Sequence, residues 1–520
     1  MGNEGPFLFT LLASYAINAP DAKQTAVGKP ALTQEERDVV KSAAPQLSKR
    51  KTVIRDLFDR FAPERAKWID RNRYFHDQDL AYFRFMIPEG QTILQLGSGN
   101  GDLLAALKPK RGVGVDLSGK MVEVASDRHP DLEFIEGDIE NPATLRKAKG
   151  PFDFIILTDV IGDLEDVVDT FKSLHRLCSR DTRIIVSYHS PLWAPVLKAG
   201  EYLGMKMPEP ERNWMSLGDI MALLKLADFE IIRREWRQLV PKSLFGIGSL
   251  LNRYVGTLPL VRALSLRNYV VVRSLAKQKP RYKSCTVLVP ARNERGNIEA
   301  AIQRTPQFCE DLEFMFVEGN SSDGTLEEMK RVQAAYPDKD IKVLVQDGKG
   351  KGDAVRKGFD AARGDVLMIL DADLTTPPEQ MPKFFDALNS GKGEFINGTR
   401  LIYPMDDEAM RFLNWIANHI FPLIFTWLLN QRFTDTLCGT KVLSREHYQK
   451  IVANRSYFGD FDPFGDFDLI FGAAKLNLKV VEVPVRYANR EYGETQISRF
   501  SHGWLLVRMV LFAYKKLKAF

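Results

Sequence analysis

Residues 92–107 read TILQLGSGNGDLLAAL, an apolar run that leads into a glycine-rich turn and then into a helical pattern. The glycines of this turn allow the backbone to bend sharply and to approach a ligand without a Cβ in the way. A second strand, turn and helix pattern starts at Cys285. Strands and helices alternate after both starts. The sequence therefore predicts an α/β protein of two domains, with parallel sheets and sites at the carboxyl ends of their strands.

Composition excludes several classes of protein. The chain has 520 residues, of which 45% are hydrophobic and 27% are charged, so wholesale disorder, a collagen-like repeat and a multispanning membrane protein are not expected. The formal net charge is only +5, too small a bias to predict nucleic acid as a partner. The cysteines lie far apart, without metal-ligand spacing, which favours a reducing compartment and no zinc site. They are Cys178, Cys285, Cys309 and Cys438.

The order of these patterns predicts four segments. Residues 1–32 form an apolar or flexible segment, 33–275 the first domain, 276–283 a Lys- and Pro-containing linker, and 284–520 the second domain. The apolar stretch Pro6–Ile17 has no basic residue before it, so we interpret it as mature chain and not as a signal peptide. It is also shorter than the about 20 apolar residues that span a bilayer.

The first domain has polar residues where three further strands end. Asp116 ends the second strand, 19 residues after Gly97, where a carboxylate can accept both hydroxyls of a ribose. Asp138 follows the third strand, and Thr158 ends the fourth. A plain strand-to-helix turn is the alternative for the glycines alone. The acidic ends of successive strands favour a nucleoside-containing cofactor.

The G-x-G-x-G spacing and these acidic strand ends resemble class I S-adenosylmethionine-dependent methyltransferases, which have a Rossmann-like fold. The resemblance implies that Gly97, Gly99 and Gly101 line the methionine part, Asp116 the ribose, and Asp138 with Ile139 the adenine, with Thr158 also at the cofactor. Gln95 departs from the pattern, because this family often has an acidic residue there. The alternative is therefore a domain that binds S-adenosylmethionine, or serves to position, but no longer methylates. An NAD-dependent oxidoreductase is disfavoured, since the third glycine falls one residue early.

The methyl acceptor cannot be named from the sequence. Transfer to an atom that is already nucleophilic needs alignment more than a base, so no catalytic motif is required. His189 and the segment 74–76 are candidates for the substrate mouth. Helix capping and packing are the alternative roles for these residues.

In the second domain, residues 366–380 read VLMILDADLTTPPEQ, an apolar strand that ends in Asp371 and Asp373. Two carboxylates two residues apart lie on one side of a strand and repel each other unless a cation sits between them. Mg²⁺ or Mn²⁺, bound by such carboxylates and a substrate diphosphate, is the expected arrangement. A solvated strand end is the alternative for the D-x-D pair alone.

A larger motif set accompanies this pair, in the order VPARNE, VEGNSSDGT, GKGDAVRKGF, LDADLTTPPE, NGTR, TDTLCGTK, FDLIFGAA and EVPVRYANREYGET. It resembles family 2 glycosyltransferases of the GT-A fold, most closely the polyprenyl-phosphate or dolichyl-phosphate hexose synthase type. The resemblance implies that Asp371 and Asp373 hold the metal and that a UDP- or GDP-hexose binds beside them. The implied donor-binding residues are Pro290, Arg292, Glu294, Glu318, Asp323 and Lys351. Gly319, Arg292 and Gln496 depart from the family pattern.

The acceptor of that family is a lipid phosphate, an anion that needs cations and no general base. Arginine is suited to bidentate phosphate binding, and the matching positions are Arg400, Arg411 and Arg490. A surface ion pair is the alternative for each arginine. If the acceptor were a glycan hydroxyl, an aspartate would have to act as base. Asp466 is the candidate, together with Asp468, although a helix-start role is equally compatible with FGDFDLI.

The end of the chain lacks the spanning helices of the family. Residues 503–520 read GWLLVRMVLFAYKKLKAF, with Arg508, Lys515, Lys516 and Lys518 toward the end. A helix here could place apolar side chains among lipid headgroups and lysines against anionic lipid; burial against the domain's own core is the alternative. Residues 412–429 form a second candidate contact. We therefore predict a bifunctional cytoplasmic enzyme, peripheral on the cytoplasmic face of a membrane, that joins an inverting hexosyltransferase to a methyltransferase.

Overall fold

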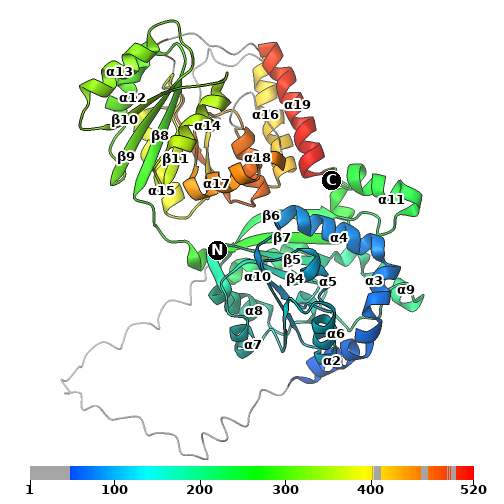
Figure 1. The fold of residues 1–520 in the computed structure, drawn as a ribbon. Helices are drawn as coiled ribbons and strands as arrows, with labels where there is room; N and C mark the ends of the chain where they lie inside the picture. Colours follow the sequence, from blue (N-terminus) through cyan, green and yellow to red (C-terminus); the bar gives the residue numbers. More distant parts are fainter. Residues whose placement is uncertain are drawn as a thin grey trace, which may run out of the picture. The chain divides into compact units, whose positions relative to one another are not determined.

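A computed structural model describes residues 47–400, 402, 412–457, 467–488, 490, 492 and 499–519; the side chains of 412–419 and 499–504 are outside the description. The structure confirms an α/β protein with two seven-stranded sheets (Figure 1). Residues 33–46 of the predicted first domain lie outside the described residues. From there on, α2 (Lys49–Phe61), α3 (Arg65–Arg71) and α4 (Arg73–Met86) precede the first sheet.

The first sheet has the strand order β3-β2-β1-β4-β5-β7-β6. Its strands are β1 (Thr92–Leu96), β2 (Arg111–Asp116), β3 (Glu133–Glu136), β4 (Phe152–Thr158), β5 (Cys178–His189), β6 (Phe229–Arg237) and β7 (Arg267–Ser274). The first five are parallel, as predicted, but β7 pairs antiparallel with both β5 and β6. The sequence pattern did not predict this reversal, because hydrophobic periodicity gives the faces of a strand and not its direction.

Helices follow most of these strands. They are α5 (Asp102–Ala106), α6 (Gly119–Arg128), α7 (Pro142–Lys147), α8 (Val167–Leu174), α9 (Ala194–Tyr202), α10 (Leu217–Leu226) and α11 (Ile247–Leu250). Apolar side chains of β1, β2, β4 and β5 form a core with α8 and α10; Leu94, Val113, Ile155 and Leu174 are fully buried there. Because β1 and β4 are neighbours in the sheet, the turn after Leu96 and the residues after Thr158 lie at the same edge.

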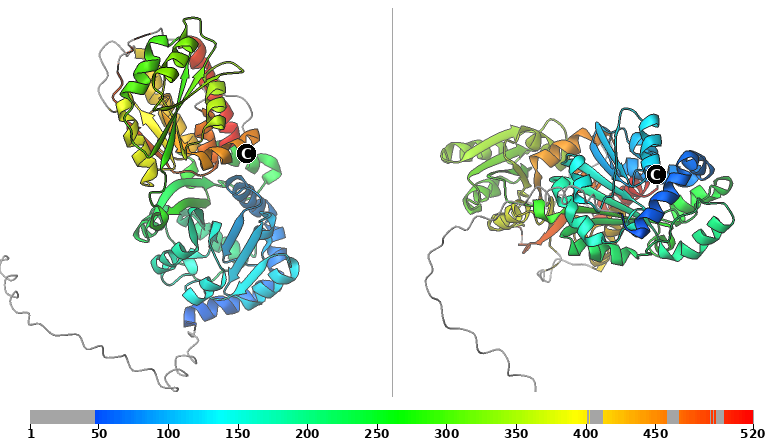
Figure 2. Two further views of the ribbon diagram at one scale, coloured as in Figure 1. Left: turned by 60° about the vertical axis from the view of Figure 1, so that its left-hand side comes forward. Right: turned by 90° about the horizontal axis from the view of Figure 1, so that it is seen from below.

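The second sheet has the strand order β10-β9-β8-β11-β13-β12-β14. Its strands are β8 (Ser284–Ala291), β9 (Asp311–Glu318), β10 (Asp340–Val345), β11 (Val366–Ile369), β12 (Phe395–Thr399), β13 (Lys441–Ser444) and β14 (Val480–Pro484). This sheet is also mixed, since β13 runs antiparallel to β11 and β12. Its strong twist is visible in the left view of Figure 2. The central strand β11 delivers Asp371 and Asp373 to the edge at which β8 and β9 end.

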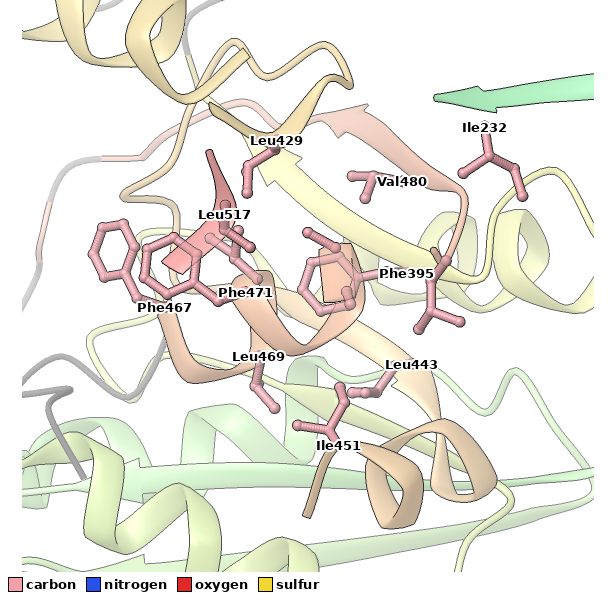
Figure 3. Close-up of a cluster of buried hydrophobic side chains, with 14 of the residues drawn as sticks. Ile232, Phe395, Leu429, Leu443, Ile451, Phe467, Leu469, Phe471, Val480 and Leu517 are labelled. Atoms are coloured by element: carbon pink, nitrogen blue, oxygen red, sulfur yellow. The ribbon is translucent and has the colours of Figure 1, made fainter. Parts of the chain in front are cut away.

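The helices of this domain cover an apolar sheet. They are α12 (Ile298–Arg304), α13 (Thr325–Ala335), α14 (Lys351–Ala361), α15 (Met381–Asn389), α16 (Phe412–Leu429), α17 (Arg445–Ala453), α18 (Phe467–Lys475) and α19 (Arg499–Leu517). Figure 3 shows Phe395 and Leu443 of the sheet among Ile451, Leu469 and Phe471 of α17 and α18. This buried layer fixes the strands whose ends carry the polar residues of the site.

Residues 412–429, the second candidate membrane contact, form the helix α16, which contacts α19. None of the described helices combines the length and the apolar character needed to cross a bilayer. One part of the sequence-based interpretation is wrong: Lys518 does not face lipid. Its side chain is fully buried, and its Nζ lies 2.9 Å from Glu235 Oε1. The carboxylate of Glu235 compensates the buried ammonium, which local sequence could not show because these residues are far apart in the chain.

Candidate functional sites

The glycine-rich turn after β1 has the backbone geometry that the sequence predicted. Gly97, Gly99 and Gly101 all have positive φ angles, of 75°, 52° and 77°. Gly101 also has no room for a side chain, since an added Cβ would lie 2.6 Å from the Phe134 ring. A larger residue at position 101 would therefore combine backbone strain with a collision.

Asp116 is held against this turn by backbone hydrogen bonds. The N–H of Gly99 donates to Oδ2 (2.7 Å), and the N–H of Ser118 donates to Oδ1 (3.0 Å). Burial raises the pKa of Asp116, and these two hydrogen bonds oppose the rise. The carboxylate is thus fixed at the end of β2, and each oxygen keeps lone pairs that can accept ligand hydroxyls.

Three buried polar atoms around the turn lack a hydrogen-bond partner among the described residues. They are Gln95 Oε1, Ser98 Oγ and Thr158 Oγ1. Buried polar groups in proteins are nearly always hydrogen-bonded, so each such atom requires an explanation. All three lie at the edge where β1 and β4 end. This orphaned set fits a polar ligand such as the amino acid part of S-adenosylmethionine, with Gln95 Oε1 as an acceptor for its ammonium group.

The predicted adenine pair lies nearby on the loop after β3. The strand ends at Glu136, two residues before Asp138. Asp138 Oδ1 accepts a hydrogen bond from the Glu140 N–H (3.0 Å), and the Ile139 side chain is buried. A carboxylate beside an apolar surface is chemically suited to an adenine, whose amino group donates and whose faces are apolar. The assignment of this pair remains a prediction.

A buried ion cluster lies beyond the ends of β4 and β5. Asp159 has a positive φ of 58°, uncommon for a residue other than glycine. Its Oδ1 lies 2.5 Å from Arg267 Nη1 and 3.1 Å from His189 Nδ1. Burial would raise the pKa of Asp159, but Arg267 and then His189 hold it well below the usual range. The carboxylate therefore stays ionised beside His189 Nδ1.

This arrangement leaves His189 with one unused nitrogen. Within the described part of the chain, Nε2 of the ring has no hydrogen-bond partner, and the Phe75 ring stacks on His189 at 5.9 Å. His76 is the next residue of α4, and burial lowers its pKa to about 4. The two predicted candidates for the substrate mouth, His189 and segment 74–76, are thus brought together by the fold, which their distance in sequence could not show.

In the second domain, both carboxylates of the predicted metal pair have cationic partners. Lys351, the first residue of α14, donates from Nζ to Asp371 Oδ1 (2.7 Å). Burial would raise the pKa of Asp371, but Lys351, Lys441 and Arg400 hold it below the usual range. Asp371 is therefore an ionised carboxylate in a site with compensating positive charge, and its role as a metal ligand stays a prediction.

Arg490 connects Asp373 to another predicted donor residue. Its Nη2 lies 2.7 Å from Asp373 Oδ2, and its Nη1 lies 2.9 Å from Glu294 Oε1. The other oxygen of Asp373 accepts a hydrogen bond from the Thr375 hydroxyl (2.8 Å). Burial raises the pKa of Glu294, and Arg490 opposes this rise. The fold thus places an arginine predicted for the acceptor directly on a carboxylate predicted for the metal.

Gly439, in the TDTLCGTK segment, lies directly against the Asp371 carboxylate. An added Cβ at this glycine would lie 1.9 Å from Asp371 Oδ2, so no other residue fits while the carboxylate keeps its place. The fully buried Lys441 follows two residues later, and its charge acts on Asp371. The sequence prediction did not assign roles to these two residues. Their presence in the quoted motif was the only available signal.

The remaining donor residues surround the ends of β8 and β9. Pro290 and Arg292 lie at the end of β8, with Arg292 exposed and its Cβ 3.0 Å from the position of a Cβ added to Gly319. Glu318 ends β9 and accepts a hydrogen bond from the Ser321 N–H (2.5 Å). Asp323 accepts one from the Arg295 N–H (3.2 Å). The predicted set therefore gathers around one sheet edge, and its roles remain predictions.

The other acceptor candidates have different outcomes. Arg400 forms a two-point ion pair with the buried Asp435, from Nε to Oδ2 (2.7 Å) and from Nη2 to Oδ1 (2.9 Å). Arg411 and Asp466 lie outside the described residues, as does Gln496. Asp468 lies in the first turn of α18 and pairs with Arg455 (3.1 Å). This position fits the helix-start alternative, and a role of Asp468 as base stays a prediction.

A group of metal-ligating side chains also occurs away from both sites, at Asp181, Glu394 and His447. Glu394 already accepts two hydrogen bonds from Arg183 (2.8 and 2.9 Å), and Asp181 pairs with Lys450 (2.9 Å). Because these cations neutralise both carboxylates, the group has the charge balance of a structural ion network and not of a divalent metal site.

Family comparisons match one model to a part of each domain. Residues 47–234 match the family model described as methyltransferase domain, and residues 286–458 match the one described as glycosyl transferase family 2. A solved SAM-dependent methyltransferase from Thermotoga maritima, described as a possible histamine N-methyltransferase, is 18% identical, with a TM-score of 0.33. That match covers 42% of this chain and 99% of the solved one.

Curated relatives match the second half. The dolichol-phosphate mannosyltransferase of Pyrococcus furiosus is 37% identical over 216 residues, which is 41% of this chain and 58% of the relative. The low-salt glycan biosynthesis hexosyltransferase of Haloferax volcanii is 28% identical over 232 residues, which is 44% of this chain and 52% of the relative. The chain thus spans about half the length of these relatives. It joins a methyltransferase domain to a domain of glycosyl transferase family 2.

Proposed function

We propose that the second domain is a metal-dependent, inverting glycosyltransferase that moves a hexose from a UDP- or GDP-sugar to a polyprenyl phosphate. The observation that carries this proposal is the charge arrangement at the end of β11, where Asp371 meets Lys351 and Asp373 meets Arg490. Two carboxylates with adjacent cations can bind a divalent ion and a diphosphate together. In such a complex Mg²⁺ or Mn²⁺ would neutralise the charge on the leaving diphosphate.

The basic groups at this site support a phosphate acceptor. An ionised phosphate is already nucleophilic, so its oxygen can attack the sugar C1 as the bond to the diphosphate breaks, without a general base. Once Arg490 leaves Asp373, its guanidinium group can donate two or more hydrogen bonds to such an anion. The name of the P. furiosus relative also points to a dolichyl phosphate. A glycan hydroxyl as acceptor remains the alternative, with Asp466 as its base.

The test is hexosyl transfer by the full chain with variants of the metal pair. Asp373→Ala should abolish Mn²⁺-dependent sugar transfer to dolichyl phosphate and Mn²⁺-dependent binding of the nucleotide. Binding of S-adenosylhomocysteine, measured by calorimetry, should not change. Equal loss of both ligands would show a folding defect and contradict independent sites. Transfer to a sugar hydroxyl, but not to dolichyl phosphate, would replace the lipid acceptor by a glycan.

For the first domain, we infer S-adenosylmethionine-dependent methyl transfer. The positive-φ glycines, the fixed Asp116 and the orphaned Gln95 Oε1 support binding of this cofactor. His189 is placed to receive a proton from an acceptor, because Asp159 holds its Nδ1 side while Nε2 is unused. The methyl acceptor is accordingly proposed to bind between His189 and the orphaned atoms at the end of β4.

Asp116→Ala tests the cofactor site. The substitution removes a ribose acceptor and leaves the Gly99 N–H unpaired, so we expect binding of S-adenosylhomocysteine to weaken at least about tenfold. Hexosyl transfer should remain unchanged. Failure of the native chain to bind this ligand would contradict the proposal. Binding without methyl transfer to any lipid, sugar or protein fraction would instead favour a positioning domain that no longer methylates, an alternative raised by Gln95.

We further propose that the protein is peripheral on the cytoplasmic face of a membrane. Exposed apolar side chains on the adjacent helices α16 and α19 support this, namely Ile420, Leu423, Val507 and Leu511. Arg508 is exposed on the same helix as Leu511. Flotation of the full chain with dolichol-containing vesicles tests the proposal, and Leu423→Ser with Leu511→Ser should reduce the bound fraction. Nucleic acid is not a proposed partner.

A further inference from the structure

A second apolar surface lies on the methyltransferase domain, in the segment between β6 and β7. Six large apolar side chains of this segment are more than half exposed: Leu244, Phe245, Ile247, Leu250, Leu260 and Leu264. Phe245 is fully exposed and Leu260 is 91% exposed. Single exposed leucines are normal on protein surfaces, but so many within 21 consecutive residues form a contiguous feature that usually marks an interaction site.

The backbone holds these side chains outward. Leu244, Phe245 and Gly246 have consecutive positive φ angles of 46°, 57° and 95°. The turn is closed by hydrogen bonds from the Gly246 and Gly248 N–H groups to the Ser243 carbonyl (2.9 and 2.8 Å). A Cβ at Gly248 would lie 1.9 Å from the Lys242 carbonyl oxygen, so this closure requires glycine. A bulky residue with positive φ is strained, which argues for a selected position of Phe245.

The neighbouring helix α9 extends the same surface. Its Tyr202 is 92% exposed, and Leu203, Val196 and Leu192 are exposed as well. Trp193 Nε1 donates to the Leu264 carbonyl (2.9 Å). Asn72 accepts a hydrogen bond from Lys242 (2.8 Å) and donates one to the Met205 carbonyl (3.1 Å). These bonds tie the two segments together; Figure 1 shows α9 and α11 on the same side of this domain.

The charged residues of these two segments are mostly basic. Residues 191–206 and 240–264 contain Lys198, Lys206, Lys242, Arg253 and Arg262. Their only acidic residue is Glu201, which pairs with Lys206 at 2.9 Å. Lys198, Lys242 and Arg253 are exposed. Apolar side chains with flanking Lys and Arg and without free acidic groups are typical of segments that bind at an anionic lipid interface.

We propose that residues 191–206 and 240–264 form a docking surface for anionic lipid, with Phe245, Leu260 and Tyr202 inserted among the headgroups. A bilayer fits better than a protein partner, since lysine is depleted at protein interfaces, whereas anionic headgroups attract it. The inference rests on the proposed peripheral association and deepens it: the methyltransferase domain contacts lipid through side chains of its own, beside those of α16 and α19, which this segment touches where Trp427 Nε1 donates to the Thr257 carbonyl (2.8 Å).

The experiment is flotation of the full chain with phosphatidylcholine vesicles, with and without phosphatidylglycerol. We expect the triple variant Tyr202→Ser, Phe245→Ser and Leu260→Ser to lose about tenfold or more of its partition into anionic vesicles. A matched control, Leu226→Ser, Leu275→Ser and Val345→Ser, removes exposed apolar side chains elsewhere and should bind as the native chain does. Thermal melting and S-adenosylhomocysteine binding verify that each variant is folded.

The outcomes separate this inference from the proposal on which it rests. Equal partition of the triple variant and the native chain overturns the docking surface, and if Leu423→Ser with Leu511→Ser then reduces partition, peripheral association still holds. Absence of vesicle binding by the native chain overturns both. Loss of a dimer in the triple variant, without any change in vesicle binding, would assign the surface to a second copy of the chain and overturn lipid docking.

Discussion

Arg490 Nη2 lies 2.7 Å from Asp373 Oδ2, although the two residues are 117 positions apart in the chain. The same guanidinium group holds Glu294 at 2.9 Å. A cation therefore occupies an oxygen that a divalent metal would use, so under the proposed function the arginine and the metal would compete for Asp373. Release of the arginine would then make both its charge and the freed carboxylate available to a bound donor and acceptor.

This competition predicts opposite effects of Arg490→Ala on metal binding and on transfer. Removal of the guanidinium frees Asp373, so Mn²⁺ alone should bind several-fold more tightly, as measured by electron paramagnetic resonance of free Mn²⁺. Hexosyl transfer should fall by about 10²-fold, because a cation that would bind the acceptor phosphate during transfer is lost. Arg490→Lys should restore part of the transfer. Weaker Mn²⁺ binding in the alanine variant would contradict the competition.

Gly439→Ala tests whether the close approach of Gly439 to Asp371 is required in the same site. The added Cβ would lie 1.9 Å from Asp371 Oδ2 and must displace the carboxylate. We expect Mn²⁺ binding and hexosyl transfer to drop by about 10²-fold, since misplaced metal ligands no longer fix the diphosphate. Gly200→Ala on α9 is the matched control, because the nearest atom to its added Cβ is 4.0 Å away. A Gly439→Ala chain with native transfer would show that Asp371 does not need its present position.

Arg267 supports the methyltransferase domain by charge. It is fully buried and pairs with Asp79 and Asp159. Arg267→Met leaves these two carboxylates without their partner, so we expect a loss of about 3–5 kcal/mol in the free energy of unfolding. Arg234→Met on the neighbouring strand removes an exposed arginine and should change stability by less than about 1 kcal/mol. Equal losses in the free energy of unfolding for the two variants, measured by urea titration, would show that the buried ion pairs of Arg267 do not contribute to stability.

His76 predicts a dependence of stability on pH. Burial lowers its pKa from 6.5 to about 4, so between these values the unfolded chain binds a proton that the folded chain does not. Stability should therefore rise as pH increases from 4 to 6.5, by about 2–3 kcal/mol for this group. The groups facing it are Arg65, Arg267, Asp79 and Asp159.

The measurement is urea unfolding of the native chain and of His76→Asn at several pH values. Other groups also titrate in this range, so the quantity to compare is the difference between the two proteins. The free energy of unfolding of the native chain minus that of the variant should increase as pH rises from 4 to 6.5, because only the native chain regains stability at this position. A difference that is independent of pH would mean that the imidazole keeps its ordinary pKa in the folded protein.

Local sequence was enough to predict the elements that carry both sites. Residues 92–107 contain an apolar run and then glycines that tolerate positive φ, so strand, turn and helix follow from short-range sterics. The apolar run before Asp371 likewise predicts a buried strand with carboxylates at its end. Such features depend on neighbouring residues alone, which is why the motifs could be recognised without a structure.

Only the tertiary structure decided which charges meet. The pairing of Arg490 with Asp373, of Lys518 with Glu235, and the contact of Gly439 with Asp371 join residues far apart in the chain. The antiparallel direction of β7, which brings Arg267 to Asp159, could not be predicted from the sequence either. A buried charge is tolerated only where an opposite charge lies within a few ångströms, and that proximity depends on how strands are ordered in a sheet, which no local pattern specifies.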